Sequence, residues 1–213
     1  FTVNTSEAVS VIGNPTLTLS TGATATYDAV ASTSTSLKFN YTVASGQNSS
    51  DVTITAINLT GVTVLDAAGN GANLTGAVGN PTGTLVVDTI TPSTPSLALG
   101  TGVSNGATAT EATQVSGVVT VAAESGATTN VTFTNGANSV TKSVTGTGSA
   151  QAVALTSADL TTLGNGTISV SATATDAAGN TSSAGTTSFT LDTVAPTVSS
   201  TTEPSAALKA GGQ

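Results

Sequence analysis

The chain has 213 residues, of which 46 are Thr and 26 are Ser, so roughly a third of its side chains carry a hydroxyl group. It contains 11 acidic residues, three Lys, no Arg, no His and no Cys, and its formal net charge is −8. The lack of His and Cys excludes Ser-His-Asp and Cys-His nucleophiles and thiolate zinc sites. Three cations are too few to follow a nucleic-acid backbone, and no apolar run approaches the roughly 20 residues of a membrane span. We therefore expect an acidic all-β protein that is not an enzyme, binds no nucleic acid and does not insert into membranes.

Short runs in which β-branched and polar residues alternate predict the strands. Period-2 alternation is typical of strands that are buried on one face only. A tight hairpin turn is predicted at Asn135-Gly136, and Ser157–Leu163 is the only segment that favours a helical turn. In chain order the predicted strands are 1–4, 23–28, 36–44, 51–58, 118–123, 130–134, 166–175 and 186–192. Strands at this spacing, with turn residues between them, indicate antiparallel β-sandwiches.

Two motifs occur twice, in the same order. Asp66-Ala-Ala-Gly-Asn70 returns as Asp176-Ala-Ala-Gly-Asn180, and each copy precedes an alternating run and an Asp-Thr-x-x-Pro linker. Because a linker with Pro after a last strand is a natural domain boundary, we expect a first domain over 1–91 and a second over 92–195. The first domain is expected to lack its opening strand, which residues 196–213 would supply to a following repeat.

These motifs, with Ser6-Glu-Ala-Val9 after the first strand, resemble the bacterial Ig-like repeats of large surface adhesins. The resemblance covers nearly all of the second domain and is weaker in the first. It implies two tandem Ig-like antiparallel β-sandwiches within the extender region of an adhesin exported by type I secretion with a C-terminal RTX segment. The expected function is that of a non-enzymatic, calcium-stiffened spacer, secreted to the bacterial cell surface, which contributes to adhesion and biofilm formation. Its expected partners are neighbouring repeats of the same protein.

The acidic residues predict calcium sites at the ends of the sandwiches. Three Lys cannot pair with 11 carboxylates, and Ca²⁺ takes six to eight oxygen ligands in flexible geometry. Strand direction gathers the candidate ligands into two clusters. One cluster holds Asp88, Glu124, Asp176 and Asn180, and the other holds Glu7, Asp66 and Asn70 with Asp192 of a preceding copy.

Two alternatives stay open at this point. The Asp-x-x-Gly-Asn motif also fits a plain β-turn whose side chains bond the local backbone. The chain is also compatible with a subunit of an extracellular filament, sheath or surface layer, in which residues 196–213 are donated to the open sheet edge of the next copy, head to tail.

Overall fold

The structure, a computed structural model, describes residues 1–202. Its contacts divide the chain into two compact units. The first unit comprises residues 1–92 together with 175–182, and the second comprises 93–174 together with the described residues from 183 onward. The division after Pro92 falls at the end of the first Asp-Thr-x-x-Pro linker, whereas the sequence analysis had assigned 175–182 to the second domain. Both units are built from antiparallel sheets, so the all-β prediction is confirmed.

The first unit contains a five-stranded sheet and a separate two-stranded sheet. Side chains on these strands alternate between core and solvent, as on β3, where Leu17 and Leu19 are buried and Thr18 is exposed. In spatial order the large sheet consists of β1 (Thr2–Asn4), β5 (Ser36–Asn40), β4 (Thr24–Thr33), β3 (Thr16–Leu19) and β6 (Ile54–Asn58). The small sheet pairs β2 (Val9–Ile12) with β7 (Thr63–Asp66).

The first unit has its own hydrophobic core, to which both ends of its sequence contribute. Phe39 packs beside Tyr27, with ring centroids 5.7 Å apart. Val87, which lies far along the chain, is buried in the same cluster. The buried members are Leu17, Leu19, Ala25, Leu37, Phe39, Val52, Ile54 and Val87.

The segment between Asn70 and Pro92 is irregular, although the sequence predicted an alternating strand after the Asp66 loop. It contains one short 3-10 helix, η1 (Thr75–Ala77), and joins the sheets through isolated bridges such as Ser49 with Val87 and Ile54 with Gly79. Gly79 and Gly83 both have positive φ angles, of 139° and 103°. Glycines in such conformations interrupt a regular strand, which explains the difference from the prediction.

The second unit is a seven-stranded sandwich of one four-stranded and one three-stranded sheet, the arrangement of an Ig-like domain. The larger sheet contains β11 (Asn138–Thr145), β10 (Thr128–Asn135), β13 (Gly166–Thr175) and β14 (Gly185–Leu191). The smaller contains β12 (Gln151–Val153), β9 (Val119–Ala122) and β8 (Ser96–Leu99). The hairpin predicted at Asn135-Gly136 is confirmed, because Asn135 pairs with Asn138 across it.

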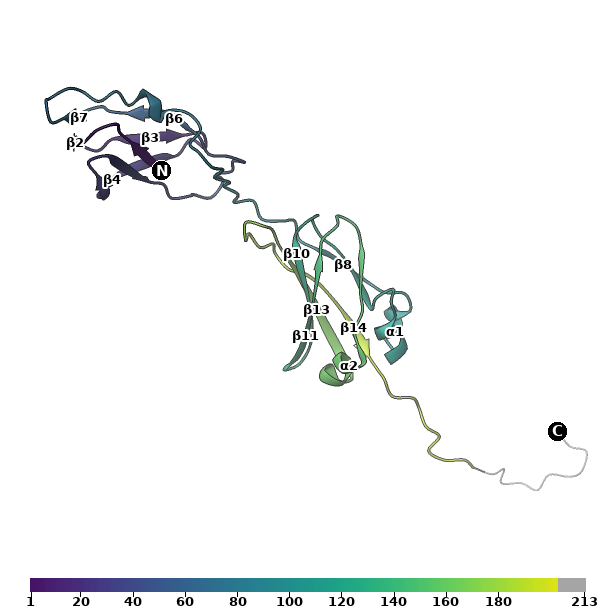
Figure 1. Cartoon of the computed structure of the whole chain (residues 1–213). Coiled ribbons are helices and arrows are strands. Elements are labelled where there is room, and N and C mark those ends of the chain that lie inside the picture. Colours follow the sequence, from purple (N-terminus) through teal and green to yellow (C-terminus); the bar gives the residue numbers. More distant parts are fainter. Residues whose placement is uncertain (203–213) are drawn as a thin grey trace, which may run out of the picture. The chain divides into compact units, whose positions relative to one another are not determined.

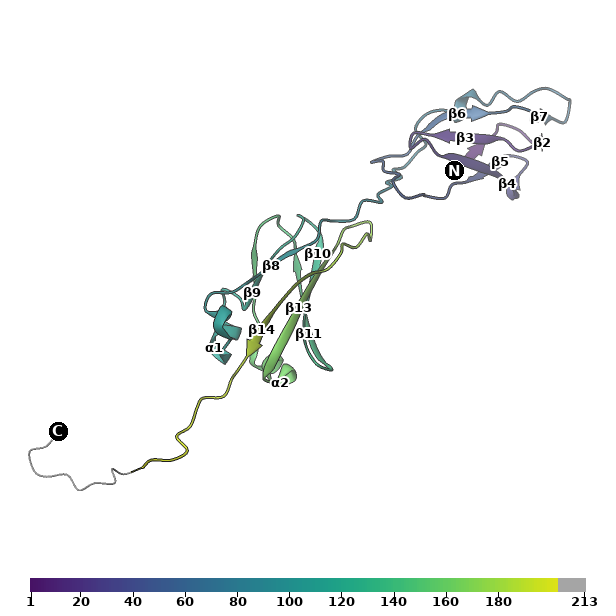
Figure 2. The same ribbon diagram turned by 180° about the vertical axis from the view of Figure 1, so that it is seen from behind.

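The core of the second unit lies between its two sheets and includes Phe133 and Phe189, whose rings meet edge to face. Three short helical segments lie at the end of the sandwich where β14 finishes: η2 (Val103–Asn105), α1 (Ala109–Thr113) and α2 (Ser157–Leu163). The prediction that Ser157–Leu163 is the only helical segment is therefore wrong, because α1 is helical too. Helix α2, which was predicted with the same bounds, lies beside β11 at one end of the sheet (Figure 1, and from behind in Figure 2). Thr156 and Asp159 form a capping box at its start.

The outer face of the four-stranded sheet carries hydroxyl groups almost exclusively. This face is the one opposite the buried positions of each strand, and its cross-strand neighbours include Thr132 and Thr141, whose hydroxyls lie 2.9 Å apart. The outward residues are Thr128, Asn130, Thr132, Thr134, Ser139, Thr141, Ser143, Thr145, Thr167, Ser169, Ser171, Thr173, Thr186, Ser188 and Thr190. The many Thr and Ser residues of the composition therefore form the solvated side of the sheet.

Candidate functional site: two repeated loops, two repeated linkers and a cleft

The loop at Asp66 is held together by its own first and last residues. Asp66 Oδ1 accepts hydrogen bonds from the backbone N–H groups of Ala68 and Asn70, each at 2.8 Å, and Asp66 Oδ2 accepts one from Asn70 Nδ2 at 2.7 Å. The turn closes through Gly69, at a φ of 91° that favours glycine. Both carboxylate oxygens therefore have donors within the loop.

The loop at Asp176 repeats this geometry bond for bond. Asp176 Oδ1 accepts from the N–H groups of Ala178 and Asn180, and Asp176 Oδ2 accepts from Asn180 Nδ2, all at 2.9 Å. Gly179 has a φ of 94°. The sequence repeat is thus a repeat of structure, and the loops have the local hydrogen bonding that the plain-turn alternative requires.

Hydrogen bonding favours the charged form of both aspartates. The side-chain hydrogen bond from Asn70, followed by the backbone one, lowers the pKa of Asp66 below its ordinary value. The side-chain hydrogen bond from Asn180 has the largest effect on Asp176 and likewise lowers its pKa. Both groups are therefore carboxylates at neutral pH.

The two Asp-Thr-x-x-Pro linkers are also held alike. Asp88 Oδ1 accepts from the N–H of Ile90 at 2.9 Å, and Asp192 Oδ1 accepts from the N–H of Val194 at 3.0 Å. Asn180 Nδ2 also donates to the backbone oxygen of Asp88 at 3.1 Å. The two aspartates thus start the same local turn, one in each linker.

In each linker the Thr donates hydrogen bonds to the side-chain oxygen of a distant asparagine. We call this contact an asparagine clamp; it was not predicted from the sequence. Asn48 Oδ1 accepts from the N–H of Thr89 at 2.7 Å and lies 3.4 Å from its hydroxyl. Asn165 Oδ1 accepts from the N–H of Thr193 at 3.1 Å and from its hydroxyl at 2.8 Å. The clamps lie 41 and 28 residues from their threonines. Because these separations differ, no fixed spacing in the sequence pointed to them.

A cleft of about 600 Å³ in the first unit brings three of the predicted ligands to one place. Glu7, Asp66 and Asn70 all line it. Its lining includes the chain from Thr2 to Glu7 and residues of the segment 70–81. The backbone oxygen of Glu7 accepts a hydrogen bond from the Thr5 hydroxyl at 2.7 Å.

Glu124 lies in the second unit, where its Oε2 accepts a hydrogen bond from the N–H of Ser93 at 3.3 Å. Across residues 1–202, no three side chains of the His, Cys, Asp and Glu types form a group that could hold a metal ion. The carboxylates of Asp66 and Asp176 already accept hydrogen bonds on both oxygens. These residues do not assemble a calcium cage by themselves, and calcium binding stays a prediction.

A comparison with protein-family models gives no match, and a comparison with curated protein sequences gives none either. In the described part of the chain, no helix has both the length and the apolar character needed to span a membrane.

Proposed function

We propose that the chain is a non-enzymatic extender of a bacterial cell-surface adhesin, in which tandem β-sandwich repeats act as a spacer. The repeated linker geometry is the observation that carries this proposal. Each linker begins with an Asp that accepts from the residue two positions later and continues with a Thr that is held by an Asn.

Such a repeat suits a mechanical role. A linker that is tied to folded protein by side-chain hydrogen bonds has fewer accessible conformations than a free one. If every repeat of an array ends in a linker with these hydrogen bonds, each repeat is joined to the next with the same local geometry. The outer hydroxyl face of the second unit supports the proposal, since it is solvated without carrying charge.

Single-molecule stretching tests the mechanical part of this proposal. The chain is placed between marker domains and pulled from its ends. We expect two separate force peaks, each releasing a contour length on the order of 300 Å for about 100 residues. Extension of the chain without force peaks would contradict a load-bearing spacer.

The proposed location has its own test. Antibodies against residues 93–192 are expected to label intact cells of the source bacterium. Labelling that requires permeabilised cells would place the protein inside the cell and rule out the adhesin proposal.

Calcium stiffening is the remaining part of the proposal. A ligand that binds only the folded state raises its unfolding temperature. We expect calorimetric unfolding temperatures to be higher in 5 mM Ca²⁺, a concentration chosen as on the order of the millimolar affinities of extracellular modules, than in chelator. Asp176→Asn should reduce the difference, whereas Asp28→Asn, which changes a carboxylate outside both predicted clusters, should preserve it. Identical unfolding temperatures with and without calcium would contradict calcium binding and would leave both loops as plain β-turns.

A further inference from the structure

Strand β1 has one paired edge and one edge that faces the cleft. It pairs with β5, and Phe1 and Phe39 exchange backbone hydrogen bonds while the N–H of Thr5 donates to Thr35. Because backbone groups alternate in direction along a strand, those of Thr2 and Asn4 point away from β5. Both residues line the cleft. Within residues 1–202, β1 has no second partner strand.

The cleft has the features of a site that accepts a strand. Its lining includes Gly76 to Pro81, and Gly79 forms a β-bridge with Ile54 of β6. Val3, Val9 and Leu74 add apolar surface to its lining. An unpaired strand edge beside apolar surface is the arrangement that β-augmentation uses, with main-chain bonds for affinity and pockets for alternate side chains.

The second unit shows which segment belongs at such an edge. After the first linker, the chain continues from Pro92 into β8, an edge strand of the three-stranded sheet. Leu97 and Leu99 of β8 pair with Val121 and Val119 of β9 and pack against the core. The segment that follows the first Asp-Thr-x-x-Pro linker therefore forms an edge strand, which begins at Ser96, four residues after Pro92.

The segment after the second linker has no such place in the described structure. Residues 195–202 lie outside every strand and are all exposed, with Val198 at 84%. From Pro196 to Thr202 the segment is uncharged and rich in β-branched residues, Thr197-Val198 and Thr201-Thr202 among them. Seven extended residues reach about 23 Å, more than enough to run along β1 and the residue after it, Thr2 to Thr5, all of which line the cleft.

We propose that residues 196–202 of one copy of the chain add as an edge strand to β1 in the cleft of a second copy. The donor and the acceptor are different surfaces of the chain, so the contact is heterologous and joins copies head to tail. This inference goes beyond the spacer role and does not depend on it. Residues 203–213, the remainder of the predicted opening strand, lie outside the described residues.

Cysteine cross-linking tests the proposed contact directly, because the chain has no Cys of its own. Asn4→Cys and Val198→Cys chains of different mass are mixed and oxidised. We expect a mixed disulfide in at least tenfold greater yield than for Val198→Cys with Thr145→Cys, an exposed position on the edge strand β11. Equal yields would overturn the proposal. A double variant that forms only an intrachain disulfide would overturn it too.

The oligomeric state gives a second, independent measurement. Light scattering should show the full chain growing in mass with concentration, and a chain that ends at Ala195 should stay monomeric. Asn4→Pro removes the N–H that faces the cleft and should abolish growth, whereas Ser143→Pro on β11 should preserve it. A synthetic peptide of residues 192–202 should inhibit growth of the full chain, a result that does not depend on how the Pro variants fold. A full chain that stays monomeric up to about 1 mM, the concentration at which a contact with a millimolar Kd is about half occupied, would refute the proposal, and so would growth that persists after truncation.

Discussion

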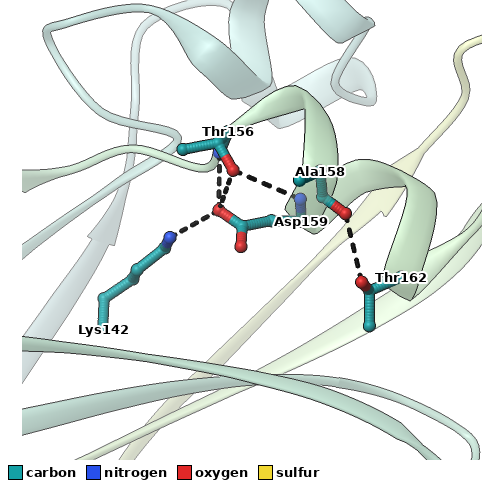
Figure 3. Close-up of polar contacts among 5 residues, drawn as sticks. All are labelled: Lys142, Thr156, Ala158, Asp159 and Thr162. Carbon is teal, nitrogen blue, oxygen red and sulfur yellow. Dashed lines mark hydrogen bonds and ion pairs between the residues drawn. The ribbon is translucent and has the colours of Figure 1, made fainter.

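Lys142 on the edge strand β11 and Asp159 at the start of α2 form an ion pair, with Lys142 Nζ 2.5 Å from Asp159 Oδ2 (Figure 3). The same carboxylate oxygen accepts hydrogen bonds from the N–H of Thr156 at 2.6 Å and from its hydroxyl at 2.8 Å. One aspartate therefore both caps the helix and ties it to the sheet edge.

Removing this carboxylate should destabilise the second unit. Asp159→Ala loses the ion pair and the two hydrogen bonds from Thr156, although Thr156 remains as the N-cap, and we expect the free energy of unfolding to fall by about 1–2 kcal/mol. Lys142→Met removes only the ion pair and should cost less, about 0–1 kcal/mol. Denaturant midpoints at constant m-value measure both changes. Equal losses for the two variants would show that the hydrogen bonds from Thr156 contribute nothing.

The same carboxylate should make the stability of the second unit sensitive to acid. Burial raises the pKa of Asp159, but hydrogen bonds from Lys142 and Thr156 and the charge of Lys142 outweigh it, so the pKa falls below its ordinary value. A pKa that is lower in the folded state adds stability above about pH 4, and this stability is lost as the pH falls through the folded pKa. Unfolding midpoints from pH 7 to pH 2 should therefore fall less steeply for Asp159→Asn than for the natural chain. Parallel curves would contradict this assignment.

The asparagine clamps should hold the linker threonines. Asn165→Ala removes the acceptor for two hydrogen bonds from Thr193, and we expect faster amide exchange at Thr193 with a stability loss of about 1 kcal/mol. Asn48→Ala should have the same effect at Thr89. Asn73→Ala is the control, because Asn73 accepts from Thr75 in a separate turn. Unchanged exchange at both threonines would remove the main support for the repeated-linker argument.

We expect the two units to unfold independently, because each has its own hydrophobic core. Phe133→Ala removes a fully buried ring from the second unit and should cost about 3–5 kcal/mol there. Phe39→Ala is the matched change in the first unit. Calorimetry should show that each variant lowers one of two transitions and leaves the other in place. A single transition that moves with both variants would mean that the units unfold together.

Features that depend on near neighbours could be predicted from the sequence. The bounds of Ser157–Leu163 and Gly166–Thr175 match the structure because a capping box and period-2 alternation are local patterns. The two Asp-x-x-Gly-Asn loops belong to the same class, since the hydrogen bonds that their Asp side chains accept come from residues two to four positions later. Phe1, Phe39, Phe133 and Phe189 lie in alternating runs, which predicts core positions for all four; the last three are buried, whereas Phe1 is only partly buried.

Which distant segments pair with one another could be known only from the tertiary structure. The clamps of Thr89 and Thr193 join residues 41 and 28 positions apart, and β2 pairs with β7 more than 50 residues away. Strand pairing depends on which apolar faces meet in one core, and an alternating run has the same appearance whichever partner it takes. The sequence by itself thus determined the repeated loops, helix α2 and part of the strand set, although it did not single out β2, β3, β7, β8 or β12, while the folded core decided which edge of β1 faces the cleft.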